Sequence, residues 1–380
     1  MTGVARPARE VSLRKDSGGR PFARILVANR GEIALRIIRT CRDLGIEVVA
    51  VYSHADVGAA HVVAADDAVR IGPAPAGESY LRGDTIIAAA LSSGAEAIHP
   101  GYGFLSERPA FARSVTEAGL VFVGPPATAI EALGDKLAAR RTAIGADVPV
   151  VPGTFEPAPV DRPDAVEEIV AAGERMGFPL LVKAAAGGGG RGMRRVEDAR
   201  TLPAALLAAS TEAGAAFGDG AVYLEREVRP ARHIEVQLIG DATGDVVALG
   251  ERDCSIQRRH QKLVEETPAP GLTPEERRGL HEMAVRAARA AGLSSTSTAE
   301  FLFDEFLRDP DGNVWFLEVN ARLQVEHGVT ELVTDLDLVA EQLWIAAGRP
   351  LSDDVRRAAE AAATRARHAI EVRLAAEDPS

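Results

Sequence analysis

Residues 318–327 restrict the fold of this chain more than any other stretch, because polar and apolar residues alternate strictly from residue 318 to 326. Successive side chains of an extended strand point to opposite faces, so one face of such a strand would be entirely apolar. The other face would carry these polar side chains: Glu318, Asn320, Arg322, Gln324 and Glu326. The alternation therefore predicts a strand with one face on a hydrophobic core and one face lined with functional groups.

The polar face of this stretch has the chemistry of a binding site. Carboxylate and amide oxygens are hard ligands for Mg²⁺, and a planar guanidinium suits a small planar anion. A strand with a solvated outer face is the common alternative for such an alternation. Solvation does not require two carboxylates, two amides and a single guanidinium in one row, so the pattern favours a metal ion and an anion bound side by side.

Length and charge restrict the class of protein. A chain of 380 residues exceeds the size at which one hydrophobic core keeps growing, so two or three lobes are expected. The net charge of -12 argues against nucleic acid or an anionic membrane surface as a partner. No apolar run approaches the roughly 18 residues of a membrane span. Cys41 and Cys254 form no metal-ligand spacing, so a reducing, cytoplasmic location is the default.

Lysine is scarce, and this scarcity marks functional positions. Among 43 basic residues the lysines are Lys15, Lys136, Lys183 and Lys262. Arginine has taken nearly every general surface role, whereas lysine offers the compact ammonium that a phosphate oxygen in a tight site accommodates. The last three lysines lie beside the motifs described below, which favours them as phosphate or anion ligands.

The N-terminal region has the pattern of a parallel α/β sheet. Residues 24–30 and 47–52 are apolar runs on either side of an amphipathic helix, and this order predicts a parallel βαβ unit. Residues 97–100 and 120–124 supply further short strands. A glycine-rich loop over 99–107 follows a strand, at the edge where open α/β sheets bind their ligands. The G-x-G-x-x-G pattern of a dinucleotide site is missing.

A run of glycines, Gly187 to Gly190, follows a predicted strand over 178–183. Glycines allow successive N–H groups to face one way and to cradle an anion. The run is not a P-loop, because Lys183 precedes the glycines and no Gly-Lys-Ser/Thr follows. A flexible hinge is the alternative, but a mobile flap over nucleotide phosphates fits better.

The second half of the chain gathers polar side chains. Residues 251–262 hold the densest cluster of side-chain donors, and they are expected to form a loop after a strand, with a solvated basic loop as the alternative. A turn over 309–312 predicts a hairpin that places Glu300 opposite Glu318, so that two carboxylates converge on one cation. Helices are expected over 275–291 and 332–348, and a strand carrying Arg373 follows them.

Together these motifs resemble the biotin carboxylase component of biotin-dependent carboxylases, an ATP-grasp enzyme, either as the alpha chain of an acyl-CoA carboxylase or as the N-terminal part of a longer carboxylase. The matching segments are 28–33, 99–107, 134–136, 183–193, 232–235, 251–266, 318–327 and 371–373. The resemblance implies an α/β (α+β) ATP-grasp fold with a Rossmann-like parallel-sheet lobe, a mobile lid and an incomplete C-terminal lobe. The implied domains are a disordered tail over 1–22, an N-terminal domain over 23–135, an ATP-grasp domain over 136–336 with its lid at about 152–227, and the start of a C-terminal domain over 337–380.

The resemblance also implies roles for individual residues. The ATP ligands would be Lys136, Lys183, Gly187, Gly188, Gly189, Gly190, Gly192, Met193, Glu225, His233, Gln257 and His260. Mg²⁺ or Mn²⁺ would be held by Glu300, Glu318 and Asn320. Bicarbonate would be held by Lys262, Arg322, Gln324 and the backbone of Val325. Glu326 would be the general base, and Arg373 would stabilise the biotin enolate.

The implied reaction is the carboxylation of biotin on a carrier protein through carboxyphosphate. The implied partners are the biotin carboxyl carrier domain, a carboxyltransferase component and a second copy of the chain in a homodimer. Another ATP-grasp carboxylate-amine ligase, of the carbamoyl-phosphate or purine-pathway kind, is the alternative enzyme. A truncated nucleotide-binding remnant without turnover is the alternative of a different class.

A few positions depart from the family pattern. Serines stand at Ser295 and Ser297 where the family has glycines, Asp147 and Arg367 also replace glycines, and Gly328 replaces a proline. No catalytic group is lost by these changes. A former glycine position that requires a positive φ would cost about 1 kcal/mol with a side chain present.

Overall fold

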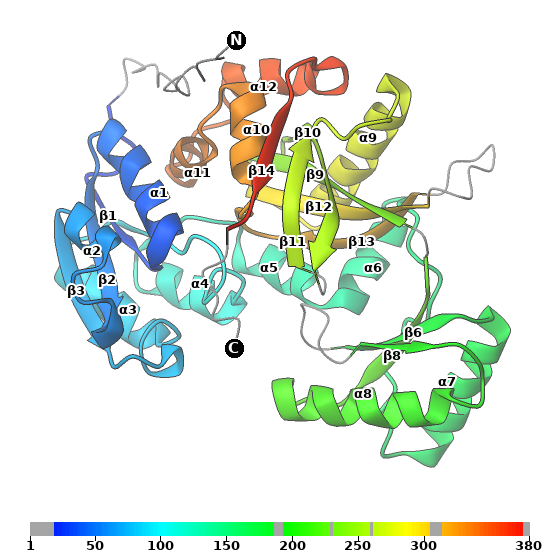
Figure 1. Ribbon diagram of the computed structural model, residues 1–380. Coiled ribbons are helices and arrows are strands. Elements are labelled where there is room, and N and C mark those ends of the chain that lie inside the picture. Colours follow the sequence, from blue (N-terminus) through cyan, green and yellow to red (C-terminus); the bar gives the residue numbers. More distant parts are fainter. Residues whose placement is uncertain (1–18, 186–192, 229–230, 259–260, 305–313, 375–380) are drawn as a thin grey trace, which may run out of the picture.

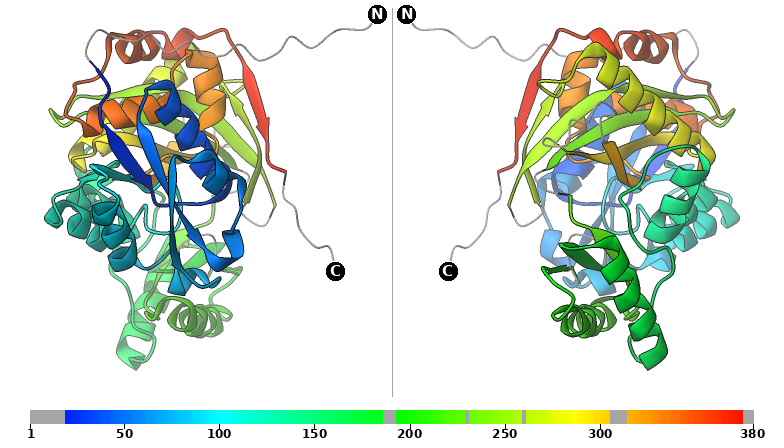
Figure 2. Two further views of the ribbon diagram at one scale, coloured as in Figure 1. Left: turned by 90° about the vertical axis from the view of Figure 1, so that its left-hand side faces the viewer. Right: turned by 90° about the vertical axis from the view of Figure 1, so that its right-hand side faces the viewer.

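The computed structural model describes residues 19–185, 193–228, 231–258, 261–304 and 314–374. Figure 1 shows a body in which an N-terminal lobe lies beside a large curved sheet, and a smaller lobe that projects from this body. Both side views in Figure 2 show the smaller lobe below the rest of the molecule. We call it the projecting lobe, residues 152–227.

The N-terminal lobe contains a parallel sheet with the strand order β3-β2-β1-β4-β5. Its strands are β1 (Arg24–Val27), β2 (Glu47–Ser53), β3 (Asp67–Gly72), β4 (Ala97–His99) and β5 (Val121–Phe122). Its helices are α1 (Gly31–Asp43), α2 (Ala60–Ala64), α3 (Gly83–Ser92) and α4 (Pro109–Glu117), with short 3-10 turns η1 (His54–Asp56) and η2 (Ala76–Glu78). The apolar stripe of α1 is buried, which confirms the predicted βαβ unit.

The glycine-rich loop after β4 is held tightly against β1. Asn29 Nδ2 donates to the carbonyl oxygens of Pro100 and Tyr102, each at 2.7 Å. Gly101 has φ +64°, and a Cβ there would lie 3.0 Å from Ile33 Cγ1, so no larger residue fits without displacing α1. The loop is thereby fixed at the carboxyl edge of the sheet, and its last residue, Glu107, reaches the central sheet.

The central sheet is antiparallel, with the order β13-β12-β9-β10-β11-β14. Its strands are β9 (Ala231–Gly240), β10 (Val246–Arg258), β11 (Gln261–Thr267), β12 (Ser295–Asp304), β13 (Val314–Asn320) and β14 (Ala369–Val372). The helices around it are α5 (Ala127–Gly134), α6 (Lys136–Gly145), α9 (Pro274–Ala290), α10 (His327–Thr334), α11 (Leu338–Ala346) and α12 (Asp353–Glu360), with the 3-10 turn η3 (Ala362–Thr364).

The two faces of the central sheet differ in chemistry. Ile234, Val236 and Leu238 of β9 pack in one hydrophobic core with residues of α6 and α9. Glu235 and Gln237, the residues between them, lie fully buried on the opposite face, where α10 packs. The alternation of β9 therefore separates an oily face that holds the sheet in place from a polar face that can carry chemistry.

The projecting lobe is a small sheet, ordered β7-β6-β8, that packs against helices. Its elements are α7 (Pro163–Met176), β6 (Leu180–Ala184), β7 (Arg194–Val196), α8 (Leu202–Phe217) and β8 (Val222–Arg226). Leu180, Val182 and Leu224 of the sheet share a core with Ile169 of α7 and Leu206 of α8. This lobe thus has its own hydrophobic core and can keep its shape independently of the body.

The helix predicted over 275–291 is α9, and the predicted pairing of Glu300 with Glu318 is present. Asp135 caps α6 by accepting from the N–H groups of Leu137 and Ala138, and Thr273 begins α9 with a capping box. In the β12–β13 hairpin, Glu300 pairs directly with Glu318. The predicted turn at 309–312 lies outside the described residues.

The prediction of one continuous strand through Glu326 is wrong beyond Asn320. The strand β13 ends there, and α10 begins at His327 with Glu326 as its N-cap residue. Leu323, Gln324 and Glu326 are all buried, so the residues after 320 are not divided between a wet face and a dry face. The alternation persists because this irregular segment runs between a hydrophobic core and the polar site. Ala321 and Leu323 pack in hydrophobic cores, whereas Arg322, Gln324 and Glu326 make polar contacts.

Two other predictions are also corrected. The expected loop at 251–262 is mostly strand, because β10 continues to Arg258 through two register shifts and pairs with β11. Its polar residues are divided between buried positions, such as Glu251 and Arg252, and exposed positions, such as Ser255 and Arg258. The expected helix over 332–348 is two helices, because Asp335 adopts φ +60° and ends α10. A single such residue stops a helix, since the left-handed conformation cannot propagate it.

Two of the positions at which this chain lacks the glycine of the family have a positive φ angle, the left-handed conformation that favours glycine. Ser295 has φ +74° and Asp147 has φ +55°. Among the described residues, Ser297 does not share this conformation. Ser295 is the first residue of β12 and pairs with Gly240, the last residue of β9.

Replacing Ser295 by Gly should increase the free energy of unfolding by about 1 kcal/mol, because the left-handed conformation costs a β-carbon-bearing residue that much. Equilibrium denaturation in urea measures the change. Ser297→Gly is the matched control and should destabilise, since it places a flexible residue in a regular strand. Equal effects of the two substitutions would contradict the assignment of strain to Ser295.

Candidate active site

A lysine surrounded by carboxylates occupies the centre of the polar sheet face. Lys262 of β11 donates from Nζ to Glu326 Oε1 at 2.8 Å and to Glu300 Oε1 at 2.9 Å. It also contacts Glu235 of β9. All three carboxylates are at least 95% buried. One ammonium therefore joins two strands of the sheet to the residue that caps α10.

Burial and mutual charge set the protonation states in this cluster. Burial alone would lower the pKa of Lys262, but the three carboxylates outweigh it and raise the pKa. Burial acts to raise the pKa of Glu300, but Lys262 and His233 outweigh it and hold the pKa well below the usual range. His233 Nε2 lies 2.8 Å from Glu300 Oε2. The ammonium and the Glu300 carboxylate are thus charged at neutral pH.

Glu326 is held between two cations. Its Oε1 accepts from Lys262, and its Oε2 accepts from Arg373 Nη2 at 2.8 Å. Arg373 also donates from Nε to Glu265 Oε1 at 2.6 Å. The side chain of Glu326 is 1% exposed. This carboxylate is oriented by both of its neighbours and lies where a substrate can reach it only by displacing or joining the two cations.

Arg322 and its neighbours form an anion-binding arrangement. Arg322 donates to Gln324 Oε1 at 2.8 Å and to Asn320 Oδ1 at 3.3 Å. Its Nε donates to Glu107 Oε2 at 2.8 Å, so the loop of the N-terminal lobe orients a guanidinium of the central region. The Nε2 atom of Gln324 is buried without a hydrogen-bond partner in the structure. An anion beside Arg322 would satisfy that donor.

The predicted metal ligands lie together at the β12–β13 hairpin. Asn320 Nδ2 donates to Glu300 Oε1 at 2.7 Å, and Glu318 faces Glu300 across the hairpin. Burial and the charge of Glu300 raise the pKa of Glu318, and the charges of Lys136 and Lys183 offset this only in part. Two carboxylates and an amide oxygen fit Mg²⁺, a hard cation that prefers oxygen ligands. A cluster of His233, Glu235 and Glu300 has compatible spacing too.

The predicted nucleotide ligands are divided between the two lobes. Lys183 of β6 contacts Glu225 of β8, which also pairs with the fully buried Arg140 of α6. Burial acts to raise the pKa of Glu225, but Lys183 and Arg140 outweigh it and lower the pKa. Lys136 lies near enough to add to this effect. A row of lysines thus lines the junction between the projecting lobe and the body.

The remaining predicted nucleotide ligands have less structural support. Gln257 donates to the carbonyl oxygen of Cys254 at 2.9 Å and pairs with Lys262 across the β10–β11 hairpin. Met193 is half-buried just before β7. Val325 is half-buried beside Glu326. The other predicted ligands lie outside the described residues: Gly187, Gly188, Gly189, Gly190, Gly192 and His260.

Sequence reasoning missed residues that act through pairing. Arg140, Arg252, Glu265 and Glu107 each bond a predicted site residue or its immediate neighbour. Glu107 ends the loop that the sequence marked, and its role was open to prediction. Sequence reasoning assigned the other three no individual role: Arg140 lies on α6, and the pairing of β10 with β9 and of β11 with β14 brings Arg252 and Glu265 to the site.

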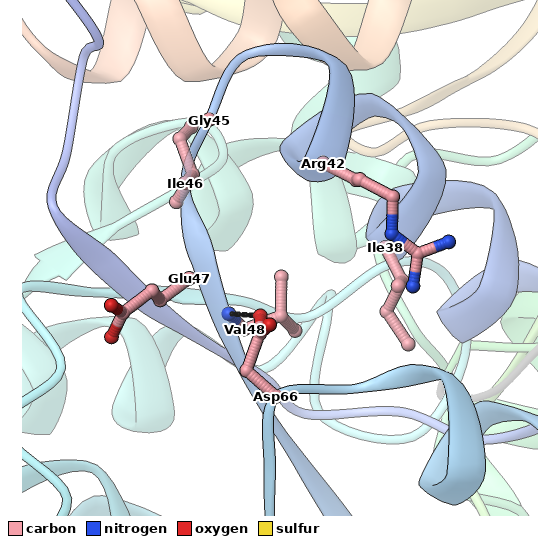
Figure 3. Close-up of a pocket in the computed structure, with 7 residues that line it drawn as sticks. All are labelled: Ile38, Arg42, Gly45, Ile46, Glu47, Val48 and Asp66. Atoms are coloured by element: carbon pink, nitrogen blue, oxygen red, sulfur yellow. Dashed lines mark hydrogen bonds between the residues drawn. The ribbon is translucent and has the colours of Figure 1, made fainter.

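The carboxylate cluster is distinct from the surface hollows of the molecule. Figure 3 shows a hollow of about 200 Å³ between α1 and β2, where Asp66 accepts from the N–H of Val48. Its lining residues are Ile38, Arg42, Gly45, Ile46, Glu47, Val48 and Asp66. None of them belongs to the predicted site, and the hollow offers no arrangement of catalytic groups.

Comparison with known families agrees with this site. Residues 21–130 match the family described as biotin carboxylase, N-terminal domain, and residues 135–354 match the ATP-binding domain of the carbamoyl-phosphate synthase L chain. Biotin carboxylase of Pseudomonas aeruginosa is 48% identical over 356 residues, which cover 94% of this chain and 76% of that protein. The chain belongs to the biotin carboxylase family.

Related carboxylases and solved structures extend this result. The propionyl-CoA carboxylase alpha chain of Ruegeria pomeroyi is 46% identical, covering 94% of this chain and 50% of that one. The structure of Campylobacter jejuni biotin carboxylase in a beta-gamma-ATP complex matches with TM-score 0.86 and 43% identity, covering 94% of this chain and 76% of that one.

A second structure, the biotin carboxylase domain dimer of Hydrogenobacter thermophilus 2-oxoglutarate carboxylase, was solved with MgADP, ADP and bicarbonate. It matches with TM-score 0.85 and 45% identity, covering 94% of this chain and 76% of that one. The ATP-grasp fold expected from the sequence is thereby confirmed. None of the described helices combines the length and the apolar character that crossing a membrane requires.

Replacing Lys183 by Ala should weaken MgATP binding by roughly ten- to a hundredfold, the value of one charge-assisted phosphate contact. Glu225 keeps its pair with Arg140, so the lobe junction should stay folded. Titration calorimetry measures the affinity. Arg194→Ala removes a positive charge from the exposed side of β7 and should leave the affinity unchanged. Unaltered binding in Lys183→Ala would exclude this lysine from the nucleotide site.

Proposed function

We propose that this chain catalyses the ATP- and bicarbonate-dependent carboxylation of biotin on a carrier protein, the first half-reaction of a biotin-dependent carboxylase. The observation that carries the proposal is that Lys262 and Arg373 each donate a hydrogen bond to the Glu326 carboxylate. Glu326 is also only a few residues from Arg322 in the sequence. This arrangement supplies an oriented base and two cations at one buried point. The family relationship supports the same chemistry.

In the first step, bicarbonate is bound by Arg322, Gln324, Lys262 and the backbone of Val325. Glu326 accepts the bicarbonate proton, and a bicarbonate oxygen attacks the γ-phosphorus of ATP, with ADP as the leaving group. The buried, unpartnered Nε2 of Gln324 supports an acceptor atom at this position. Since the protein performs little covalent chemistry, its contribution is alignment and charge neutralisation.

In the second step, carboxyphosphate breaks its C–O bond to give CO₂ and phosphate. The phosphate accepts the N1 proton of biotin, and the enolate-like ureido group attacks the carbon of CO₂. We assign Arg373 to the developing negative charge on the ureido oxygen. Burial of the cluster supports this step, because carboxyphosphate is readily lost to water.

The nucleotide is assigned to the junction of the projecting lobe and the body. Lys136, Lys183 and Glu225 would contact it from one side, and His233 and Gln257 from the other. The glycines of 187–192 and His260 are also proposed as ligands and lie outside the described residues. Glu300, Glu318 and Asn320 would hold Mg²⁺ or Mn²⁺, which neutralises phosphate charge when bound. The remaining residues orient the phosphates and exclude water.

The partners follow from the reaction. A biotin carboxyl carrier domain must present the biotin, and a carboxyltransferase component must consume carboxybiotin, with a homodimer as the proposed assembly and the cytoplasm as the proposed location. The domain boundaries expected from the sequence remain part of this proposal. A carbamoyl-phosphate type of ligase is disfavoured, because the relatives that match along the chain are biotin-dependent carboxylases.

Replacing Glu326 by Gln keeps the shape of the side chain and removes the base, so bicarbonate- and biotin-dependent ADP release should fall by roughly 100-fold or more. MgATP affinity should hardly change, because the nucleotide ligands are elsewhere. Glu331→Gln, on the same helix but directed to Arg36, is the matched control and should retain turnover. Near-normal turnover in Glu326→Gln would move the role of the base to another residue.

A further inference from the structure

The charged groups of the site form one alternating chain. Arg252 pairs with Glu235, which contacts Lys262, and this lysine pairs with Glu326. Glu326 pairs with Arg373, which pairs with Glu265. The inner four groups are the proposed catalytic groups and their direct contacts. Arg252, at one end, touches no group to which the proposed reaction assigns a role in binding or proton transfer.

The charged side chain of Arg252 is completely enclosed. Its side chain is 0% exposed, as is that of Glu235. Isolated burial of a guanidinium costs several kcal/mol, so such a residue persists only where hydrogen bonds and an opposite charge compensate it. Its Nε donates to Glu235 Oε1 at 2.6 Å. This bond leaves the other oxygen of Glu235 directed at Lys262.

The two terminal nitrogens of Arg252 connect separate elements. Nη1 donates to Gln237 Oε1 on β9 at 2.7 Å and to Thr330 Oγ1 on α10 at 2.9 Å. Nη2 lies 3.2 Å from Thr298 Oγ1 on β12. A planar fork is the only side-chain shape that meets these directions together. Arg252 thus connects the sheet to helix α10, whose N-cap residue is Glu326.

We propose that Arg252 is a positioning residue for biotin carboxylation: its fork fixes the Glu235 carboxylate behind Lys262 and the N-terminus of α10 beside it, so that the ammonium meets Glu326. The inference rests on the proposed function of the site. Glu235 is the intermediate link, because it is the one carboxylate that contacts both Arg252 and Lys262 in the described part of the chain.

The neighbouring residue in β10 offers a matched control. Glu251 points to the opposite sheet face, where it is fully buried and pairs with Arg277 at 2.7 Å and with His281 at 2.7 Å. This buried ion pair has similar chemistry but packs against α9 instead of α10. Arg277→Lys therefore makes the same substitution in a second ion pair, between Arg277 of α9 and the buried Glu251 of β10, without touching the site.

The first experiment compares Arg252→Lys with Arg277→Lys. Lysine keeps the charge and cannot make the four contacts, so kcat for biotin-dependent ADP release should fall roughly 10- to 100-fold in Arg252→Lys, as for a small misplacement of reacting groups. MgATP affinity by calorimetry should stay within about twofold of the unaltered protein. Arg277→Lys should lower the unfolding temperature comparably and leave kcat unchanged. A kcat loss that is equal in both variants would show a purely structural role and overturn the proposal.

The second experiment tests the route through Glu235. If Arg252 acts partly by holding that carboxylate, Arg252→Lys should lower kcat by a smaller factor in a Glu235→Gln background than in the unaltered protein, the remaining loss reflecting its contact with Thr330 of α10. If the kcat loss of the double variant equalled the product of the losses in Arg252→Lys and Glu235→Gln, Glu235 would be excluded as the link.

A third readout does not depend on turnover. The chain has only the lysines Lys15, Lys136, Lys183 and Lys262, so ¹⁵N-lysine labelling gives few ammonium signals, and Lys262→Arg assigns the signal of Lys262. Arg252→Lys should shift that signal and speed its hydrogen exchange, and Arg277→Lys should not. An unchanged Lys262 signal in both variants would overturn the inference. If the unaltered protein showed no bicarbonate-dependent turnover while Arg252→Lys still shifted the Lys262 signal, the proposed function would be rejected. The positioning of Lys262 by Arg252 would then still stand.

Discussion

The ammonium of Lys262 is the interaction on which the arrangement of the site depends. Three buried carboxylates from different parts of the chain would repel one another without it, and burial makes such repulsion costly. Because the lysine lies on β11, the strands β9 and β12 and the cap of α10 must assemble around it at a fixed distance. The order of the central sheet can therefore be understood as the arrangement that delivers one positive charge to three negative ones.

This charge balance needs a scaffold that does not relax, and the opposite sheet face provides it. Ile234, Val236 and Leu238 of β9 pack in the core with α6 and α9, while Glu235 and Gln237 between them lie on the polar face. The loop after β4 adds a second restraint from another lobe, since Glu107 holds Arg322 in the direction of Gln324. Alternate residues of one strand thus serve the hydrophobic core and the polar site.

Much of the scaffold and of the site was predictable from the sequence. Local signals located the parallel lobe, the capped helices and the Glu300–Glu318 hairpin, because periodicity, caps and turns depend on nearby residues. The scarcity of lysine drew attention to Lys183 and Lys262, because arginine fills nearly all the general surface positions where lysine would otherwise occur. The role of Arg140 was beyond prediction, because a buried arginine in a helix pattern has no local signature. Strand β10 was mistaken for a loop because of its many polar residues, and the role of Arg252 was missed with it, since only the pairing of β10 with β9 brings Arg252 to Glu235.

The two chain crossings that join the projecting lobe to the body lie side by side. Arg226 N–H donates to the carbonyl oxygen of Pro152 at 2.8 Å, and Thr154 N–H donates to that of Leu224 at 2.9 Å. Rotation of the lobe about such a paired ribbon would be a hinge motion about one axis. Glu225 and its partner Lys183 lie next to the ribbon, so this rotation would displace them little and would displace the outer helices of the lobe most. The proposed nucleotide ligand Lys183 would therefore keep its place while the lobe rotates.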